Sequence, residues 1–497
     1  MSGIRVTYSG VLSFVVGIAS VVTGLIFTLI VTRQLTQEEF GTWGLIGSLT
    51  AYALIFRPVV AYWNTREIAR GEESGKTAFM SSGIFGLIAI IIYLLIAYIF
   101  GNQIDVNLEI LLFAVILIPG EYVRSVLVGI SHGYRPQNEE FGIVGFEFSK
   151  IILALFLIFV LDLGLTGAII ATAISTLVGI TILLIKTFEK IKGKLKKDYL
   201  KKWLKFFWLP IYPNISQIIN VSDIAAFSII TGSVYGLAYW SAAMTVSRIV
   251  NHSLKIGKGV YPKLLEGGRR EYFQENMTYI FYFAFPMAAI SLVFAKPALF
   301  ALNPLYEIAF PVVIFLVPMI FLRMLNELFS QALRGIEKVD VKENSTFRDY
   351  IKSKLFYVPT LRNIQRAGYL IILVGVLLSI TSFTTSQVEL VMVWSIVALI
   401  TQIPLTFFLY RMIKREFSPK LAYKNIIKYF IASLLVFSLT SLLMEQYLEY
   451  KESIFEFLPE FLKFVVLGVI SYLVLTYIID SKTKKLFKSI IKEIKSK

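Results

Sequence analysis

The chain has 497 residues, of which 56% are hydrophobic and only 16% are charged, with a mean hydropathy of +0.71. A soluble domain carries about a quarter of its residues as charges, so this composition predicts a polytopic membrane protein. The chain has no cysteine, which excludes disulfides and thiolate catalysis. The two histidines, His132 and His252, are far apart in the sequence and give no metal-ligand spacing, so we expect neither a metal nor a cofactor.

Windows of about 20 apolar residues predict an all-α fold with fourteen membrane-spanning helices. The predicted spans are 8–32, 40–63, 79–100, 108–131, 140–161, 164–186, 206–230, 235–254, 277–295, 305–333, 367–385, 388–410, 425–444 and 461–480. The first basic residue, Arg5, precedes an apolar run longer than a signal-peptide core, so the first span is interpreted as a retained helix.

The distribution of lysine and arginine predicts the orientation of these spans. Forty-one of the 49 basic residues fall in one alternating set of loops, which includes both termini, and only four fall in the opposite set. By the positive-inside rule, both termini are cytoplasmic and the protein lies in the cell membrane. The loops on the opposite side are short, so no external domain is expected to hold a catalytic site.

The lysine-rich segment 187–205 divides the chain into two predicted lobes of six helices, 1–186 and 206–410. The second lobe contains a cytoplasmic insertion, 335–366. Two further helices (411–480) and a basic tail (481–497) follow it. The lobes correspond in charge placement, because Arg57 in the second span has a counterpart in Arg248 in the eighth.

Arg57 is the most unusual residue of the second span, since an arginine at the centre of a membrane costs about 2.5–3.5 kcal/mol on insertion scales. Such a side chain normally faces protein or a wet cavity rather than lipid. Thr50, Arg57 and Asn64 are spaced seven residues apart. On one continuous helix this spacing places them on a single face.

Other charges within the spans form pairs at i,i+3 or i,i+4, which we expect to neutralise each other. These pairs are Glu121 with Arg124, Glu147 with Lys150, and Arg323 with Glu327. Arg57, Asp223 and Arg248 lack such a partner on their own helix, which makes them candidates for function.

Polar stripes on several helices predict a hydrated central cavity. His252 continues the stripe of Arg248, and Asp223 ends a polar stripe on the seventh span. Two arginines in such a cavity would suit a phosphate, which guanidinium groups bind through two hydrogen bonds. The alternative is that Arg57 and Arg248 pair with Asp223 or another acid and lock helices together. The predicted substrate-binding residues are Arg57, Asn64, Asp223, Arg248, His252, Arg323 and Glu327.

Several enzyme and binding classes are disfavoured. Residues 71–77, GEESGKT, have three residues between the glycines where a phosphate-binding loop needs four, so no ATP site is expected. No Asp-X-Asp sequence occurs, which argues against a metal-dependent glycosyltransferase. The basic charge is explained by topology and by attraction to anionic membrane lipids, and gives no support for nucleic-acid binding.

The chain resembles the polysaccharide-export flippases of the multidrug/oligosaccharidyl-lipid/polysaccharide (MOP) superfamily. The resemblance rests on residues 35–43, LTQEEFGTW, on Arg57, and on residues 66–70, REIAR. It implies fourteen helices in two lobes and the export of a lipid-linked oligosaccharide by alternating access, without catalytic residues. It also implies that Arg57 and Arg248 hold the phosphate of the head group and that the last two helices border a groove for the lipid tail. The insertion around 352–359 is more similar to archaeal members and makes a dolichol-type carrier plausible.

Two alternatives stay open beside this flippase. One is a multidrug or small-molecule antiporter of the same superfamily, which would need acids rather than arginines at the unpaired positions. The other is an integral-membrane glycosyltransferase or polymerase, which the short external loops disfavour. The expected partners are the lipid-linked substrate, membrane lipids and the glycosyltransferases of the same pathway.

Overall fold

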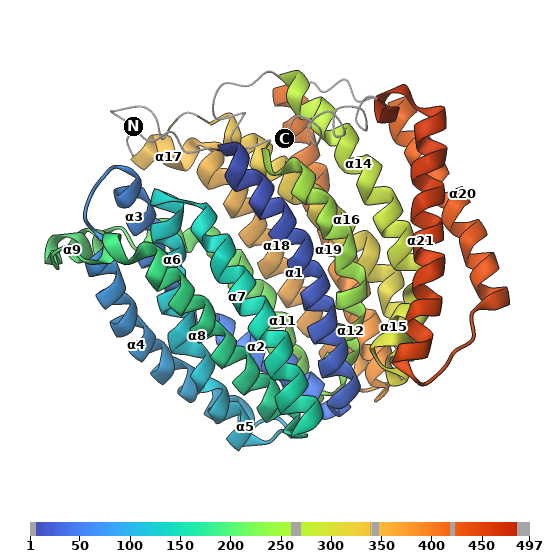
Figure 1. The fold of residues 1–497 in the computed structure, drawn as a ribbon, viewed down its shortest axis with the longest axis horizontal. Coiled ribbons are helices and arrows are strands. Elements are labelled where there is room, and N and C mark those ends of the chain that lie inside the picture. Colours follow the sequence, from blue (N-terminus) through green and yellow to red (C-terminus); the bar gives the residue numbers. More distant parts are fainter. Residues whose placement is uncertain (1–5, 260–269, 338, 340–346, 418–422, 485–497) are drawn as a thin grey trace. The chain divides into compact units, whose positions relative to one another are not determined.

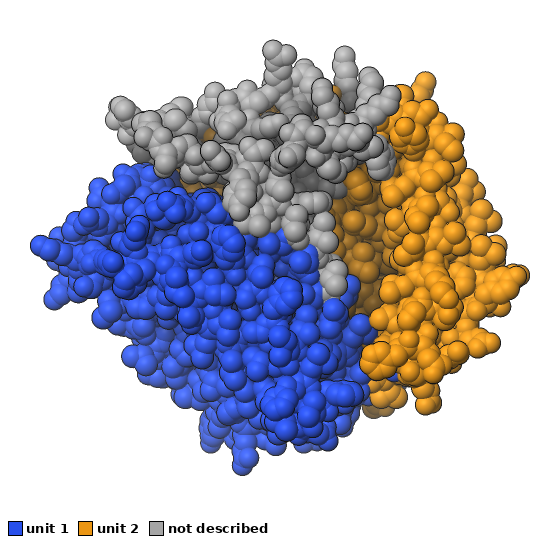
Figure 2. Space-filling view, viewed as in Figure 1, with its two compact units in different colours: residues 1–238, 374–383 blue, residues 239–373, 384–497 orange. Residues whose placement is uncertain are grey.

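The computed structural model describes residues 6–259, 270–337, 339, 347–417 and 423–484, and every regular element in them is a helix (Figure 1). The chain forms two compact units, which Figure 2 shows in different colours. Unit 1 comprises residues 1–238 and 374–383, and unit 2 comprises residues 239–373 and 384–497. These units group residues that pack together, whereas the predicted lobes are two repeats of six helices along the sequence. The predicted lobe boundary at 187–205 therefore stays a prediction.

Unit 1 is built from the first eleven α-helices and three irregular helical turns, together with the start of α12. They are α1 (Val6–Gln34), α2 (Gln37–Ala53), α3 (Arg57–Ala69), α4 (Gly75–Gly101), α5 (Leu108–Phe113), η1 (Ala114–Ile116), α6 (Leu117–Tyr134), α7 (Gln137–Ala154), η2 (Leu155–Val160), α8 (Gly164–Ile191), α9 (Lys197–Lys205), α10 (Trp208–Ile211), η3 (Tyr212–Asn214) and α11 (Ile215–Thr231).

Unit 2 begins within α12 and contains the remaining helices, apart from the end of α18, which belongs to unit 1. They are α12 (Tyr235–Ser247), η4 (Arg248–Gly259), α14 (Arg270–Val293), α15 (Ala295–Leu302), η5 (Pro304–Ala309), α16 (Phe310–Gly335), α17 (Phe347–Lys352), α18 (Lys354–Ile380), α19 (Gln387–Phe417), α20 (Tyr423–Tyr447) and α21 (Ile454–Ile479).

Among the described residues, ten helices are long and apolar enough to cross a membrane, and the bent pair α2 and α3 adds an eleventh. These eleven coincide with predicted spans. The other three predicted spans, 8–32, 206–230 and 235–254, coincide with α1, with α10 to α11, and with α12 followed by η4. The all-α class is therefore confirmed, and the helix count agrees roughly with fourteen.

The second predicted span is not one continuous helix. It breaks after Ala53 and resumes at Arg57, with a bend of 58° between α2 and α3. Pro58 lies in the first turn of α3 and has no backbone N–H to donate to the carbonyl of Leu54. Arg57 N–H donates to that carbonyl instead, at 3.0 Å. The prediction of one shared face for Thr50, Arg57 and Asn64 is wrong, because a spacing of seven aligns side chains only along an unbroken helix.

The structure also changes the start of the eleventh span. The prediction placed residues 335–366 in a cytoplasmic insertion, whereas α18 begins at Lys354 and continues to Ile380. Arg362 and Gln365 therefore lie on a helix, where Gln365 donates to the carbonyl of Thr401 on α19 at 3.2 Å. A hydropathy window leaves out the first turns of α18 because they carry polar and charged residues. In the structure, contacts with other helices supply hydrogen-bond partners for Arg362 and Gln365.

Candidate functional site

The site in unit 1 is a cluster of one glutamate and two arginines. Arg57 Nη1 lies 2.8 Å from Glu121 Oε2, and Arg124 Nη1 lies 3.3 Å from Glu121 Oε1. The second pair confirms the predicted i,i+3 pairing on α6. The first pair joins residues 64 positions apart, so it supports the interpretation in which Arg57 is held by an acid of another helix. Two cations on one anion leave the cluster with a net charge of about +1.

Close packing of α3 on α6 brings Arg57 to Glu121. The hydroxyl of Thr65 on α3 donates to the carbonyl of Gly129 on α6 at 2.9 Å. A Cβ on Gly133 would lie 2.7 Å from the carbonyl of Thr65, so only glycine fits there without a shift. At the other side of the break, Tyr122 donates its hydroxyl to the carbonyl of Ala53 at 2.9 Å. The α6 helix thus contacts both halves of the broken span.

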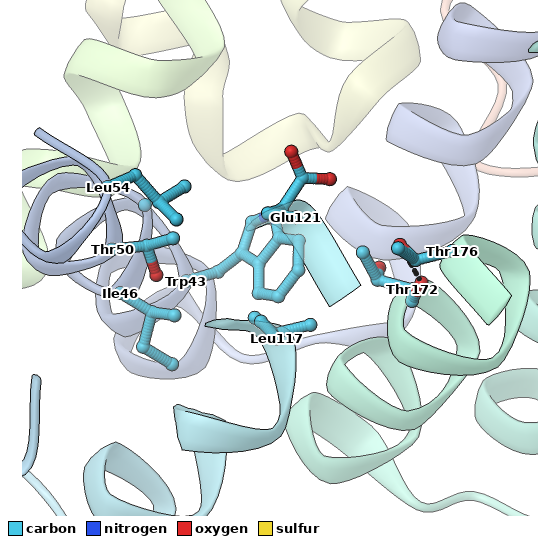
Figure 3. A pocket seen from close by; sticks show the side chains of 9 residues that line it. Trp43, Ile46, Thr50, Leu54, Leu117, Glu121, Thr172 and Thr176 are labelled. Carbon is cyan, nitrogen blue, oxygen red and sulfur yellow. Dashed lines mark hydrogen bonds between the residues drawn. The ribbon is translucent and has the colours of Figure 1, made fainter. Parts of the chain in front are cut away.

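A pocket of about 290 Å³ opens beside Glu121. Figure 3 shows it with α2 on one side, α8 on the other, and Glu121 and Leu117 of α6 between them. The Thr50 hydroxyl oxygen is buried there and has no hydrogen-bond partner among the residues that the structure describes. The lining residues are Trp43, Ile46, Gly47, Thr50, Leu54, Leu117, Glu121, Thr172 and Thr176.

Unit 2 contains a second cluster of one glutamate and two arginines. Glu327 on α16 accepts from Arg362 Nη2 at 2.5 Å, and its other oxygen lies 3.6 Å from Arg334 Nη2. Gln331 adds a hydrogen bond of 3.0 Å to Glu327. The prediction named Arg323 as the partner of Glu327, but Arg334 and Arg362 hold the two carboxylate oxygens. The hydropathy pattern assigned Arg362 to a loop. The signal that could have found it is the run of helix-forming residues from Lys354 onward, which continues the eleventh span toward its N-terminus.

The buried amide of Asn326 continues this second cluster. Its Nδ2 lies 3.2 Å from Oε1 of Gln402 on α19, and its backbone carbonyl accepts from Arg362 Nη2 at 3.4 Å. The cluster therefore connects α16 with both α18 and α19.

Asn64 lies inside unit 1, completely buried. Its amide oxygen accepts from the hydroxyl of Ser74 at 3.0 Å, and its amide nitrogen lies 3.5 Å from the carbonyl of Val126. These contacts connect the end of α3 with α6 and with the start of α4. These contacts pack the helices together, and none of them is with Arg57, Glu121 or Arg124.

Asp223 lies on α11 and is only 4% exposed. One carboxylate oxygen accepts from the backbone N–H of Ile224 at 2.8 Å. The two preceding residues receive hydrogen bonds from α2, where Ser48 donates to the carbonyl of Val221 and Tyr52 donates to the hydroxyl of Ser222. Asp223 therefore lies beside the interface between α2 and α11.

Arg248 and His252 lie on η4, the 3₁₀ helix that follows α12. Arg248 is its first residue and is exposed, whereas His252 is partly buried. Arg57 is the first residue of α3 after the break, whereas η4 follows α12 directly, so both arginines begin a helical segment. Arg323 lies on α16, one turn before Glu327, and is partly buried. Arg57 and Arg248 belong to different units, so the expectation that they face each other stays a prediction.

Known proteins show what fold this arrangement belongs to. No family model matches the sequence, and no curated protein matches it. Among solved structures, the chain is similar to the lipid II flippase MurJ in an inward closed conformation, with a TM-score of 0.66 and 13% identity over 97% of this chain and 100% of the other. It is also similar to an inward-facing multidrug resistance MATE family transporter of the MOP superfamily, with a TM-score of 0.58 and 17% identity over 80% and 95% of the two chains. An outward-facing structure of such a transporter gives a TM-score of 0.51 at 17% identity.

These likenesses and the candidate spans identify a multi-pass membrane protein with the fold of MOP-superfamily transporters.

Proposed function

We propose that this protein is a secondary transporter that moves a polyprenyl-phosphate-linked oligosaccharide from the cytoplasmic to the outer leaflet by alternating access. The observation that carries the proposal is the cluster of Arg57, Glu121 and Arg124, which has an excess of one positive charge and lies at the break of a membrane helix. Structural similarity to the lipid II flippase supports a lipid-linked substrate.

A phosphate suits this cluster because its charge complements the excess of the two arginines. Arg57 is 41% exposed and bonds to Glu121 through a single nitrogen, Nη1. The other donors of its guanidinium group can bind an anion, and charge-assisted hydrogen bonds of this kind contribute about 1.5–3 kcal/mol each. Desolvation by the surrounding apolar helices strengthens such a bond relative to water.

The break between α2 and α3 could act as a hinge for the helix that carries Arg57. Arg57 begins α3, while the pocket-lining residues Trp43 and Thr50 lie on α2. A change in the bend would therefore shift Arg57 relative to the pocket, as helix breaks do in transporters. The proposal extends to Arg248, at the start of η4, as the second phosphate ligand. Asn64, Asp223, His252, Arg323 and Glu327 stay proposed contributors to the substrate cavity.

The decisive experiment measures translocation by purified protein in proteoliposomes that contain a fluorescent polyprenyl-phosphate-linked oligosaccharide. Replacing Arg57 with alanine is expected to lower the rate at least about tenfold, the loss of one charge-assisted contact. Arg57→Lys should recover part of the rate, since it keeps the charge without the planar fork. The matched control is Arg415→Ala, which removes an exposed arginine at the end of α19. A wild-type rate for Arg57→Ala would overturn the proposal.

A second candidate function is export of cationic small molecules. The observation in its favour is that Glu121 and the indole of Trp43 line one pocket, where the aromatic ring would attract a cation and Glu121 would do so in place of one of its arginines. Efflux of a cationic dye from cells that produce the protein separates the two candidates. A multidrug exporter should lose efflux in Glu121→Gln and keep it in Arg57→Ala, while the flippase should show no dye efflux at all.

A further inference from the structure

The short helix α9 (Lys197–Lys205), which follows the spanning helix α8, has one face inside unit 1. In Figure 1 it lies beside the ends of α3 and α4 and runs across the direction of these helices. Its Trp203 is completely buried in an apolar cluster that includes Val60 of α3 and Leu127 of α6. The helix is thus a built-in part of the unit and not a free linker.

Two aromatic residues on this inner face, Trp203 and Tyr199, donate hydrogen bonds to Glu67 in the last turn of α3 and to Glu72 just after it. The indole N–H of Trp203 lies 3.3 and 3.2 Å from the two carboxylate oxygens of Glu67, and Lys202 Nζ lies 3.4 Å from one of them. The hydroxyl of Tyr199 donates to Glu72 at 2.6 Å. This hydrogen bond, with burial and the charges of the nearby acids, raises the pKa of Tyr199 to about 12. Since Glu67 is only 3% exposed, its bonds to α9 are well protected from water.

The opposite face of α9 is basic and open. Lys197, Lys201 and Lys205 are spaced four residues apart, which aligns them on one side of the helix, away from Trp203. All three are exposed. Exposed apolar side chains accompany them, with Leu204 at 48%, Phe206 at 36% and Phe207 at 45% of their surface.

We propose that this lysine face of α9, defined by Lys197, Lys201 and Lys205, binds the head groups of anionic phospholipids. The helix starts six residues after α8 ends at Ile191, so it lies near the membrane end of a spanning helix. The positive-inside rule predicts that this end is cytoplasmic, where anionic lipids attract lysines by about 1 kcal/mol each. The exposed Leu204, Phe206 and Phe207 fit the apolar layer beneath the head groups. This combination of lysines and apolar side chains favours a lipid surface over an acidic soluble partner.

Lipid binding at α9 would stabilise the position of α3. Glu67 lies in the last turn of α3 and Arg57 is its first residue, so the two are about 15 Å apart along one helix. A lipid that holds α9 therefore also holds the helix that carries Arg57. This inference does not depend on which substrate the protein transports.

The first experiment counts the lipids retained by the intact protein in native mass spectrometry, after extraction from nanodiscs of phosphatidylcholine with one fifth phosphatidylglycerol. The triple variant K197Q, K201Q and K205Q should retain phosphatidylglycerol at least about fivefold less than wild type at low salt, the factor that corresponds to a single lysine contact of about 1 kcal/mol. The matched control is R411Q, R415Q and K424Q, which removes three exposed cations from α19 and α20 and should lose clearly less phosphatidylglycerol than the lysine variant, because only the general attraction of cytoplasmic cations is removed. Equal retention of phosphatidylglycerol in both triple variants would overturn the proposal. This is also the result expected if the lysine face binds an acidic protein instead of a lipid.

The second experiment measures amide hydrogen exchange in α3 with and without phosphatidylglycerol. Wild type should exchange more slowly in the anionic nanodiscs, and the triple lysine variant should lose this difference. Trp203→Phe keeps the lysines but removes the N–H that binds Glu67, so it should retain the lipid and lose the protection of α3. If α3 exchanges at the same rate in both kinds of nanodisc for wild type, the coupling to α3 is wrong.

Discussion

Unit 1 and unit 2 each place one glutamate between two arginines, on α6 and α16 respectively, but the surroundings of the two glutamates differ. Glu121 is held by Arg124 of its own helix and by Arg57 at a helix break. Glu327 is held by Arg334 of its own helix and by Arg362 within the continuous helix α18, with a further bond from Gln331. The same net charge thus occurs once at a helix break and once within continuous helices.

The difference shows how the same charges can serve binding or stability. Arg57 is 41% exposed, whereas Arg362 is 25% exposed and also donates to the carbonyl of Asn326. A ligand can reach the first guanidinium group more easily than the second. We therefore expect the unit 1 cluster to contribute more to function and the unit 2 cluster more to the stability of the fold.

The largest effect on stability is expected from removing the charge of each glutamate, which tests directly whether the two clusters differ. Glu327→Gln is expected to lower the free energy of unfolding by about 2 kcal/mol, because Arg334, Arg362 and Gln331 lose their common anion, while the 35% exposure of Glu327 keeps the loss below that of a fully buried pair. Glu121→Gln is expected to cost about 1 kcal/mol, since Arg57 can turn toward water. Thermal unfolding midpoints in detergent measure both, with the exposed Glu449→Gln as control. An equal or reversed order would show that the two clusters are not different.

The packing of α3 on α6 offers a second, smaller effect. Gly133→Ala places a methyl group 2.7 Å from the carbonyl of Thr65 and 2.9 Å from Cβ of Ile68. The two helices must separate, which is expected to cost about 1–2 kcal/mol and to lengthen the Arg57–Glu121 contact. The control is Gly83→Ala on α4, whose Cβ would meet nothing within 4 Å. Unfolding midpoints that match for the two alanine variants would contradict this account of the site.

The smallest effect is expected at the break itself. Pro58→Ala restores a backbone N–H that can donate to the carbonyl of Leu54, so α2 and α3 can approach one continuous helix. The stability should change by less than about 1 kcal/mol, but the amides of residues 54–57 should exchange more slowly with solvent. If their exchange is unchanged, the proline does not cause the break, and the difference between the two clusters has another origin.

The sequence by itself determined the membrane class, the position of most spans and two of the three pairs predicted within one helix. Glu121 with Arg124 was predicted from a spacing of three, and the same rule predicted Glu147 with Lys150, which lie 2.9 Å apart. These features follow from hydropathy and from the 3.6-residue repeat, which are local properties of the chain.

Only the tertiary structure decided the partners of Arg57 and Glu327 and the bend in the second span. Arg57 meets Glu121 across 64 residues, and Glu327 meets Arg362 across 35, and neither distance leaves a periodic trace in the sequence. Pro58 was visible, but its neighbours decide whether a membrane proline merely kinks a helix or separates it into two. These contacts depend on which helices pack together, and a local pattern cannot contain that information.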